Sequence, residues 1–295
     1  MRWAWALTLV LGALDWIWAR RADLAFVGWP SFACVLIILL ATGFFYGYSG
    51  RSRRLSDATH YAALWIAFSA AGIIFTYLAA TLAMPLRDAE FVAFDAALGF
   101  HWLAWSGFIW SHRVIQIALF LAYASFLAQI VGSILYFAHT EQTARNTEMI
   151  WIAMLSLILS TIVSGLLPAV GPYAHFYGRQ TEDIVVLMSL RDRGAHSFAI
   201  NGLKGIITFP SFHTVLAIVF TYVHRPPSRS FIPVAILNGL ILIAIPSEGH
   251  HYLVDMIAGA LVAAMSIAIV RVAMGSNTRS DQVRAAAPGS IISTL

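Results

Sequence analysis

The chain has 295 residues, of which 60% are hydrophobic and only 11% are charged, and its formal net charge is +4. Ordinary globular domains carry roughly 25% charged residues, so this composition excludes a disordered chain, a nucleic-acid-binding domain and a secreted disulfide scaffold. A single cysteine, Cys34, excludes an internal disulfide and a cysteine-based metal site. The class that remains is an integral membrane protein.

Runs of apolar residues long enough to cross a bilayer recur along the chain. A membrane-spanning helix needs about 20 predominantly apolar residues, and eight segments approach this length. We therefore predict an all-α, polytopic membrane helical bundle of about eight transmembrane helices. The predicted spans are residues 3–19, 25–48, 60–84, 114–137, 149–170, 210–224, 231–246 and 253–273.

The first predicted span resembles the core of a signal peptide, but it carries Asp15 and lacks a convincing small-residue cleavage site. We interpret it as a retained anchor, in which Asp15 pairs with a polar partner or marks an oligomer contact. An even number of spans puts both termini on one side. With cytoplasmic termini, the arginines of residues 51–54 lie inside, whereas Arg20, Arg21 and Arg87 lie outside, so the positive-inside rule favours this orientation modestly. We expect a multi-pass protein of a cell membrane, such as a bacterial inner membrane.

Two connections between predicted spans are long. Residues 85–113 mix charged with aromatic side chains, which indicates an amphipathic segment on the membrane surface, although a re-entrant or surface loop explains the same pattern. Residues 171–209 hold the densest charge in the chain. Counting helices places both connections on the outer face, together with the short turn at residues 246–252. This face is the candidate site.

The sixth predicted span opens with Pro210, Ser211, Phe212 and His213. Proline and serine before an apolar run indicate a helix start that Ser211 caps. Such a start leaves backbone N–H groups free to bind an anion such as phosphate. His213 then lies in the first turn and can donate or accept a proton there. A capped helix with an interfacial histidine is the simpler interpretation of this motif alone.

The last predicted span opens with a second polar motif, which contains His250, His251 and Asp255. His251 and Asp255 are four residues apart and share one face of the helix. An aspartate that accepts a hydrogen bond from one ring nitrogen leaves the other available as a nucleophile or base, and an aspartate inside a membrane helix is costly unless paired. The pair could also only lock the helix. A metal site that includes His213 is a further alternative, although His250 faces away from His251.

Together, the two motifs resemble those of the type 2 phosphatidic acid phosphatase (PAP2) superfamily. The matching residues are Pro210, Ser211, His213, His251 and Asp255. Residues 249–255 and 167–173 look most like the inositolphosphotransferase branch, which includes inositol phosphorylceramide synthases. The resemblance implies a catalytic domain with a six-helix core at residues 60–273, preceded by two extra transmembrane helices at residues 1–59. Residues 274–295 form a polar tail that we expect to be disordered.

The resemblance also implies a mechanism that needs neither a metal nor another cofactor. His251 would attack phosphorus and form a phosphohistidine, Asp255 would orient His251, and His213 would protonate the leaving oxygen and later deprotonate the acceptor. Ser211 and the backbone of Phe212 would hold the phosphate oxygens. The expected partners are a lipid phosphate or diphosphate at the outer membrane interface, water or an alcohol as acceptor, and membrane lipids, with no nucleic acid. The oligomeric state stays open.

The cations of this chain depart from the family pattern. Members of the family usually carry a lysine and then an Arg-Pro pair before the serine motif, and this chain has no such pattern there. They also usually carry an arginine six residues before the nucleophilic histidine, and Ile245 occupies that position here. The Arg-Pro of Arg225 follows His213, and at 1.5 Å per residue it lies on the opposite membrane face. Phosphate contacts must therefore come from the outer connections, unless the charges there are only solvated. The candidates are Arg191, Arg193, Lys204 and His250.

Three other functions use the same residues. A simple lipid phosphate phosphatase, of the phosphatidate or polyprenyl diphosphate type, shares the mechanism and differs in its acceptor. A metal-dependent membrane hydrolase would lose activity in a chelator. A proton-coupled transporter would place its ionisable groups near the middle of the membrane, whereas His213 and His251 both lie at helix starts.

Overall fold

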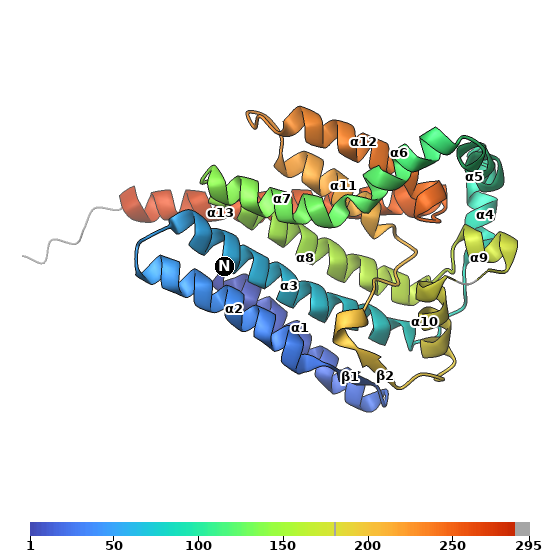
Figure 1. Ribbon diagram of the computed structural model, residues 1–295, viewed down its shortest axis with the longest axis horizontal. Coiled ribbons are helices and arrows are strands. Elements are labelled where there is room, and N and C mark those ends of the chain that lie inside the picture. Colours follow the sequence, from blue (N-terminus) through green and yellow to red (C-terminus); the bar gives the residue numbers. More distant parts are fainter. Residues whose placement is uncertain (180, 287–295) are drawn as a thin grey trace, which may run out of the picture.

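The structure of the protein is a computed structural model that describes residues 1–179 and 181–286, with side chains described up to residue 275. Each of the eight predicted spans contains a helix, although residues 25–27 of the second form a strand and the third and fifth helices end at Ala80 and Leu166, four residues early. Figure 1 shows most of these helices running side by side along the long axis of the molecule. The corresponding helices are α1 (Arg2–Arg21), α2 (Trp29–Tyr48), α3 (Arg53–Ala80), α6 (Arg113–Ala124), α7 (Phe126–His139), α8 (Thr143–Leu166), α11 (Phe212–Val223), α12 (Phe231–Glu248) and α13 (Leu253–Ala286).

The fold is the predicted all-α membrane bundle, with differences in the count of spans. Five described helices, α2, α3, α8, α12 and α13, are long and apolar enough to cross a membrane, or up to seven spans if each of two bent helix pairs counts as one. The predicted span at 114–137 is such a pair, because α6 and α7 meet at an angle of 47°. Helix α11 is a shorter apolar helix, and α1 is not in this set. Helix α13 continues to Ala286, and the rest of the predicted tail lies outside the described residues.

Short elements gather at one end of the bundle, at the right of Figure 1. They are α4 (Asp88–Ala97), α5 (Trp102–Ser111), α9 (Pro172–Tyr177), α10 (Glu182–Arg191) and the 3-10 turn Ile200–Gly202. Two three-residue strands, β1 (Ala25–Val27) and β2 (Ser197–Ala199), pair in parallel, with Phe26 opposite Phe198. This strand pair was not predicted, and it ties the α1–α2 connection to the long outer connection.

The segment at 85–113 differs from the expected surface helix. It forms the pair α4 and α5, bent by 82°, as in a broken span or re-entrant loop. Helix α4 packs against α13 and α9, and it buries Asp88, Phe91 and Asp95. Asp88 and Asp95 therefore turn inward, whereas Arg87 and Glu90 pair on the exposed side. The bend fits the alternative of a re-entrant loop better than one amphipathic helix on the membrane surface.

Helix α11 lies at the centre of the apolar core. It packs on α8, α12 and α13, and Val215, Ala217 and Phe220 are fully buried. Membrane helices gain their stability mainly from close packing, which small residues permit. Gly72 of α3 is one example, because an added Cβ would meet Leu157 of α8 at 2.2 Å. This packing fixes the starts of α11 and α13, which carry both polar motifs.

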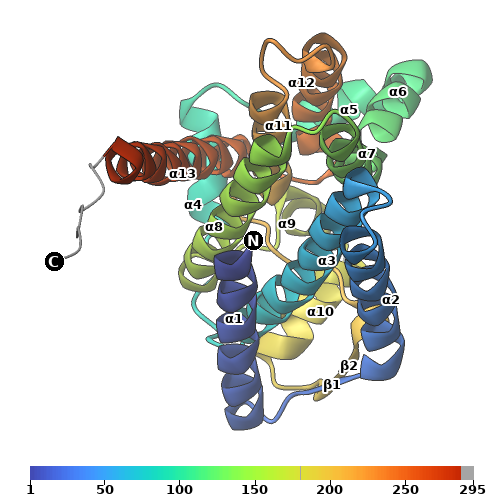
Figure 2. The same ribbon diagram turned by 90° about the vertical axis from the view of Figure 1, so that its left-hand side faces the viewer.

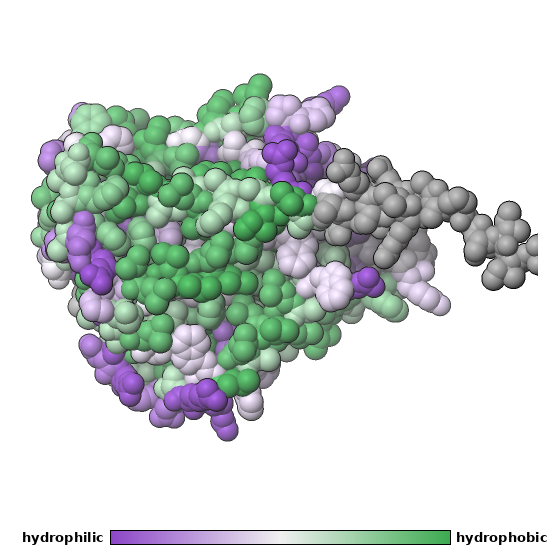
Figure 3. All heavy atoms as spheres, turned by 180° about the vertical axis from the view of Figure 1, so that it is seen from behind, coloured by the Kyte–Doolittle hydropathy of each residue, from purple (hydrophilic) through white to green (hydrophobic). Residues whose placement is uncertain are grey.

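The distribution of apolar side chains on the surface is that expected of a membrane protein. Figure 3 shows apolar side chains over the middle of the molecule, with hydrophilic ones mainly toward its two ends. Such a band matches a hydrocarbon layer bordered by aqueous interfaces. The protein is therefore an integral, multi-pass membrane protein.

Candidate active site

The starts of α11 and α13 meet in the structure. The Ser211 hydroxyl oxygen accepts a hydrogen bond from the Thr214 N–H at 3.3 Å, which confirms the predicted cap. The Ser211 N–H donates to the Asp255 carbonyl at 2.9 Å. This approach requires Gly259, since a Cβ there would lie 2.5 Å from the Ser211 carbonyl oxygen. The two motifs, forty residues apart in the sequence, thus form one site.

His251 and Asp255 form a buried pair. The Nδ1 atom of His251 lies 3.2 Å from Oδ2 of Asp255, which also accepts a hydrogen bond from the Tyr252 N–H at 2.9 Å. The exposed fractions of His251 and Asp255 are 4% and 0%. With its proton on Nδ1, the ring keeps a lone pair on Nε2. The Asp255 carboxylate therefore holds the imidazole ring of His251 through Nδ1.

His213 faces this pair from α11. The centroids of the His213 and His251 rings are 6.1 Å apart. Nδ1 of His213 lies 3.2 Å from the hydroxyl of Tyr123 on α6. A tetrahedral group between the two rings could therefore contact both of them. Tyr123 was missed by the sequence analysis, because nothing near it in the chain indicates its contact with His213.

Burial keeps His251 neutral. It lowers the pKa of His251 to about 4, against the opposing effects of a hydrogen bond with the Thr208 backbone and the negative charge of Asp183. A neutral imidazole is the form that can act as a nucleophile. At neutral pH His251 is therefore in the form that a nucleophilic role would require.

Two aspartates of α4 support the second motif. The Asp95 carboxylate accepts hydrogen bonds from the Leu253 and Val254 N–H groups at 2.8 and 2.9 Å, and so caps the start of α13. The Asp88 carboxylate accepts one from the Tyr252 hydroxyl at 2.9 Å. Neither Asp88 nor Asp95 was predicted from the sequence as a site residue. Their spacing of seven places them on one helical face within an apolar stretch, which was an available signal.

Asp88 also holds the loop at residues 170–171. Its two oxygens accept hydrogen bonds from the Val170 and Gly171 N–H groups at 3.1 and 2.9 Å. Gly171 has a φ of +85°, and an added Cβ would lie 2.8 Å from the His250 carbonyl oxygen. The turn that contains Gly171 therefore packs directly against the second polar motif, and glycine is needed there for both its conformation and its contact.

The structure separates the predicted phosphate-binding cations. Lys204 pairs with Glu182 on the exposed surface, and this hydrogen bond raises the pKa of Lys204. Arg193 lines a cavity beside α1, together with Leu14 and Trp18. In the contacts of the described residues, neither cation reaches the histidines. The ring of His250 stacks on Tyr173 of α9, with centroids 4.4 Å apart.

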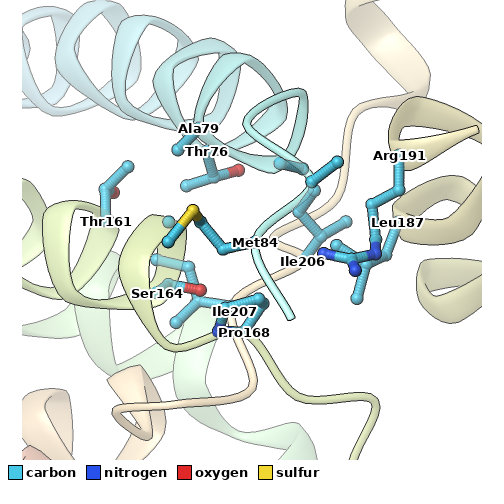
Figure 4. Close-up of a pocket in the computed structure, with 13 residues that line it drawn as sticks. Thr76, Ala79, Met84, Thr161, Ser164, Pro168, Leu187, Arg191, Ile206 and Ile207 are labelled. Atoms are coloured by element: carbon cyan, nitrogen blue, oxygen red, sulfur yellow. The ribbon is translucent and has the colours of Figure 1, made fainter. Parts of the chain in front are cut away.

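Arg191 lies close enough to Asp88 for their charges to interact. Its guanidinium enters a small cavity beside Ile206, as Figure 4 shows, and its Nη1 atom has no hydrogen-bond partner among the described residues. Burial lowers the pKa of Arg191, and the charges of Asp192 and Asp88 oppose this effect. The cavity, of about 10 Å³, has room for roughly one water molecule. Arg191 must therefore leave it in order to contact a phosphate.

An apolar cavity borders His213. It has a volume of about 270 Å³ and opens among α3, α7, α8 and α11. His213 and Phe212 form one part of its lining, and the side chains of Trp65, Phe68 and Met154 form much of the rest. The cavity therefore places apolar space directly beside His213.

Two further interpretations from the sequence concern the position of Arg225 and a possible metal site. Arg225 lies beyond the far end of α11, where its Nη2 atom is 2.9 Å from Glu148, as expected for a residue on the opposite face. In the described part of the chain, no group of three or more histidine, cysteine, aspartate or glutamate side chains is placed to hold a metal ion.

Comparison with known proteins gives one match. The family model described as the PAP2 superfamily matches residues 89–269, which is more than half of the chain and includes both polar motifs. No curated protein and no solved structure matches the chain.

Proposed function

The chain belongs to the PAP2 superfamily, which includes lipid phosphatases and phosphotransferases, and from this premise we propose that it transfers or cleaves the phosphate group of a lipid through a phosphohistidine. The observation that carries the proposal is the buried His251–Asp255 pair facing His213, with ring centroids 6.1 Å apart. This arrangement supplies a nucleophile, a group that orients it, and a proton donor on the opposite side.

In the first step, Nε2 of His251 attacks phosphorus while the bond from phosphorus to the leaving oxygen breaks. His213 donates a proton to that oxygen, so the leaving group departs as a neutral alcohol. The proton on Nδ1 of His251 stays in its hydrogen bond with Asp255, which balances the positive charge that develops on the ring. The products of this step are phosphohistidine and the released alcohol.

In the second step, an acceptor O–H approaches from the side that the alcohol left. His213, now deprotonated, takes the acceptor proton while the acceptor oxygen forms a bond to phosphorus. The bond between phosphorus and Nε2 breaks, and His251 returns to its neutral state. Water as the acceptor gives hydrolysis, and an alcohol gives transfer.

Hydrogen-bond donors and one cation are placed to stabilise the negative charge of the phosphate group during its transfer. Ser211 uses its oxygen lone pair to cap α11, and its O–H remains able to donate to a phosphate oxygen. The first N–H groups of α11, beginning at Phe212, have no partner within the helix and bind anions well. Arg191 supplies a full positive charge once its guanidinium turns outward. Donors of this kind stabilise a transition state strongly in a site that excludes water.

A lipid substrate fits this place better than a soluble phosphate ester. The cavity of about 270 Å³ beside His213 is lined mainly by apolar side chains and lies within the helical bundle. An acyl or prenyl chain in that cavity would hold its phosphate at the starts of α11 and α13. Both starts lie at the end of the bundle that carries the short elements, which we assign to the outer membrane face (Figure 1).

We assign the acceptor to the alcohol class, and inositol is one alcohol with which the test can be made. Residues 249–255 and 167–173 resemble the inositolphosphotransferase branch, and the Gly171 turn packs against the His250 carbonyl. This contact couples the two segments that carry the resemblance. Hydrolysis by water is the alternative outcome for the same intermediate.

The test is a reaction series with the purified protein in mixed micelles. Release and transfer of phosphate are measured on lipid phosphates, lipid diphosphates and phospholipids, with and without inositol. We expect turnover that vanadate inhibits and that EDTA leaves unchanged. Activity that is lost in EDTA and restored by zinc would overturn the metal-independent mechanism, and hydrolysis without transfer would assign water as the acceptor.

A further inference from the structure

A groove separates the two N-terminal helices on the side of α3 away from the candidate active site. Helices α1 and α2 both pack on α3, and Figure 2 shows them standing apart with α3 between them. The groove has a volume of about 590 Å³, within the roughly 300–1,000 Å³ of small-molecule sites. Three alanines of α3 form its floor, and small residues of α1 form one wall. They are Ala67, Ala70, Ala71, Gly12 and Ala13.

Asp15 lines this groove without a partner. Its exposed fraction is 3%, and neither of its carboxyl oxygens has a hydrogen-bond partner among the described residues. By contrast, the hydroxyl of Thr8, which also lines the groove, donates to the Ala4 carbonyl at 2.9 Å. A buried polar group without a partner is costly, most of all inside a membrane. Asp15 therefore needs a hydrogen-bonding group that an occupant of the groove can bring.

The size of the groove decides what kind of occupant fits. An α-helix about 10 Å wide occupies roughly 400 Å³ per turn, so the groove holds little more than one turn. A further membrane helix, from a second copy or another protein, is too bulky to enter along its length. A flexible hydrocarbon chain fits between α1 and α2 and matches the alanine floor.

The depth of Asp15 indicates which part of a lipid it meets. Arg20 and Trp29 lie at the outer end of the groove, where cationic and aromatic side chains favour the membrane interface. Asp15 is five residues before Arg20, which is about 7.5 Å deeper along α1. That depth matches the backbone of a lipid, just below its head group. A hydroxyl both donates and accepts hydrogen bonds, so it suits a carboxyl in either protonation state.

We propose that this groove is a second lipid site, which binds a membrane lipid bearing a free hydroxyl at the level of Asp15. The site is distinct from the catalytic cavity. Helix α3 presents Ala67, Ala70 and Ala71 to the groove, and it presents Trp65 and Phe68 to the cavity beside His213. The groove lies outside the residues matched by the family, 89–269, and the inference goes beyond the proposed catalytic function.

Photolabelling of the full chain in phosphatidylcholine nanodiscs tests the site. The probe is a diacylglycerol with a photoactivatable chain, and the control probe is its methyl ether, which lacks the hydroxyl donor. We expect labels on α1 and α2, with about tenfold stronger labelling by the alcohol, the effect of one hydrogen bond to a buried carboxyl. In Asp15→Leu, both probes should label equally.

A matched pair of glycine variants separates binding from folding. An added Cβ at Gly12 or at Gly107 meets no described atom within 4 Å, so a side chain can begin at either position without a clash. Gly12 lines the groove and Gly107 lies on α5. Gly12→Leu should lower labelling of α1 and α2 about tenfold, and Gly107→Leu should leave it unchanged.

Three results would overturn the second lipid site. They are equal labelling of the wild-type groove by both probes, unchanged labelling in Gly12→Leu, and crosslinking of α1 to a second copy in place of lipid labels. Phosphate transfer, measured on the same samples, reports the catalytic proposal separately. Its loss without a change in labelling would count against the catalytic function alone.

Discussion

The two ends of α11 hold buried polar clusters built from similar residue types, yet the clusters differ in how completely they are hydrogen-bonded. At the inner end, Glu148 accepts hydrogen bonds from Arg225 at 2.9 Å and from the Tyr222 hydroxyl at 2.7 Å. Both ring nitrogens of His224 have hydroxyl partners, Ser133 at 3.0 Å and Ser230 at 2.6 Å. This cluster has no obvious capacity left for a ligand.

At the outer end, the bonds are incomplete. Oδ1 of Asp255 and the hydroxyl of Thr214 have no hydrogen-bond partner among the described residues, and the rings of His213 and His251 face each other with centroids 6.1 Å apart. Buried polar groups are almost always satisfied in a structural role. Buried histidine and carboxylate side chains at the end of a helix therefore do not by themselves identify a reactive site, because the inner cluster contains both. What distinguishes the outer cluster is a histidine–aspartate contact combined with unfilled hydrogen-bonding capacity.

The largest expected effect separates the histidines at the two ends. His251→Ala should lower kcat by about 10⁴-fold or more, the usual loss for a catalytic nucleophile. The matched variant His224→Ala should keep kcat and lower the free energy of unfolding by about 1–3 kcal/mol, because Ser133 and Ser230 lose a partner. Initial rates and thermal unfolding in the same detergent measure both effects. Similar activity losses in the two variants would contradict the comparison.

The second effect concerns stability at the inner end. Glu148→Ala should reduce the free energy of unfolding by about 2–4 kcal/mol, because it leaves Arg225 without its carboxylate, although Arg225 keeps some contact with solvent. The activity of the folded fraction should stay close to that of the wild type. A selective loss of kcat with no loss of stability would give the inner cluster a functional role.

The third effect tests the support that α4 gives to the outer end. Asp95→Ala should lower kcat by about 10- to 100-fold with little change in KM, since it uncaps α13 beside His251 and disturbs the geometry of attack. Asp95→Asn retains one acceptor oxygen and should recover part of the rate. If both variants lose stability and keep kcat, Asp95 only holds the fold.

The fourth effect is the dependence of activity on pH. Because burial lowers the pKa of His251 to about 4, the reactive neutral form persists until the pH falls to that value. The kcat/KM profile should therefore lose activity about tenfold per pH unit below about 4, after correction for unfolded protein. An acid limb at the ordinary histidine pKa, near 6.5, would show that His251 is not the group that controls the rate.

The smallest expected effects compare two cations of the outer connection. Arg191→Ala should raise KM about five- to tenfold, as for one charge-assisted phosphate contact that must first leave its cavity. Lys204→Ala should change KM less than about twofold, because Glu182 already pairs with its ammonium group. The opposite order of effects would identify Lys204 as the phosphate ligand, and no effect of either would remove both from the phosphate site.

Local spacing made much of the fold and part of the site predictable. The eight apolar runs correspond to helices, and the i, i+4 spacing of His251 and Asp255 produces their contact at 3.2 Å. Ser211 caps α11, and the length of α11 places Arg225 at the other end. These features depend on residues close together in the sequence. The catalytic roles stay predictions until they are measured.

The remaining features depend on contacts between distant segments, which spacing does not report. Asp95 and Leu253 are 158 residues apart in the sequence, and Tyr123 and His213 are 90 apart. The pairing of Lys204 with Glu182 needed the course of the outer connection. A charged segment such as 85–113 looks solvated in the sequence, and only the packing of α4 shows that its aspartates face inward.

The most direct test of the catalytic account is capture of the covalent intermediate. The protein is mixed with a lipid phosphate labelled with ³²P and quenched within the first turnover, and the labelled peptide is identified by mass spectrometry. We predict a label on His251 that is stable in base, labile in acid and absent in His251→Ala. Turnover without a label on His251, or a label on another residue, would contradict the account.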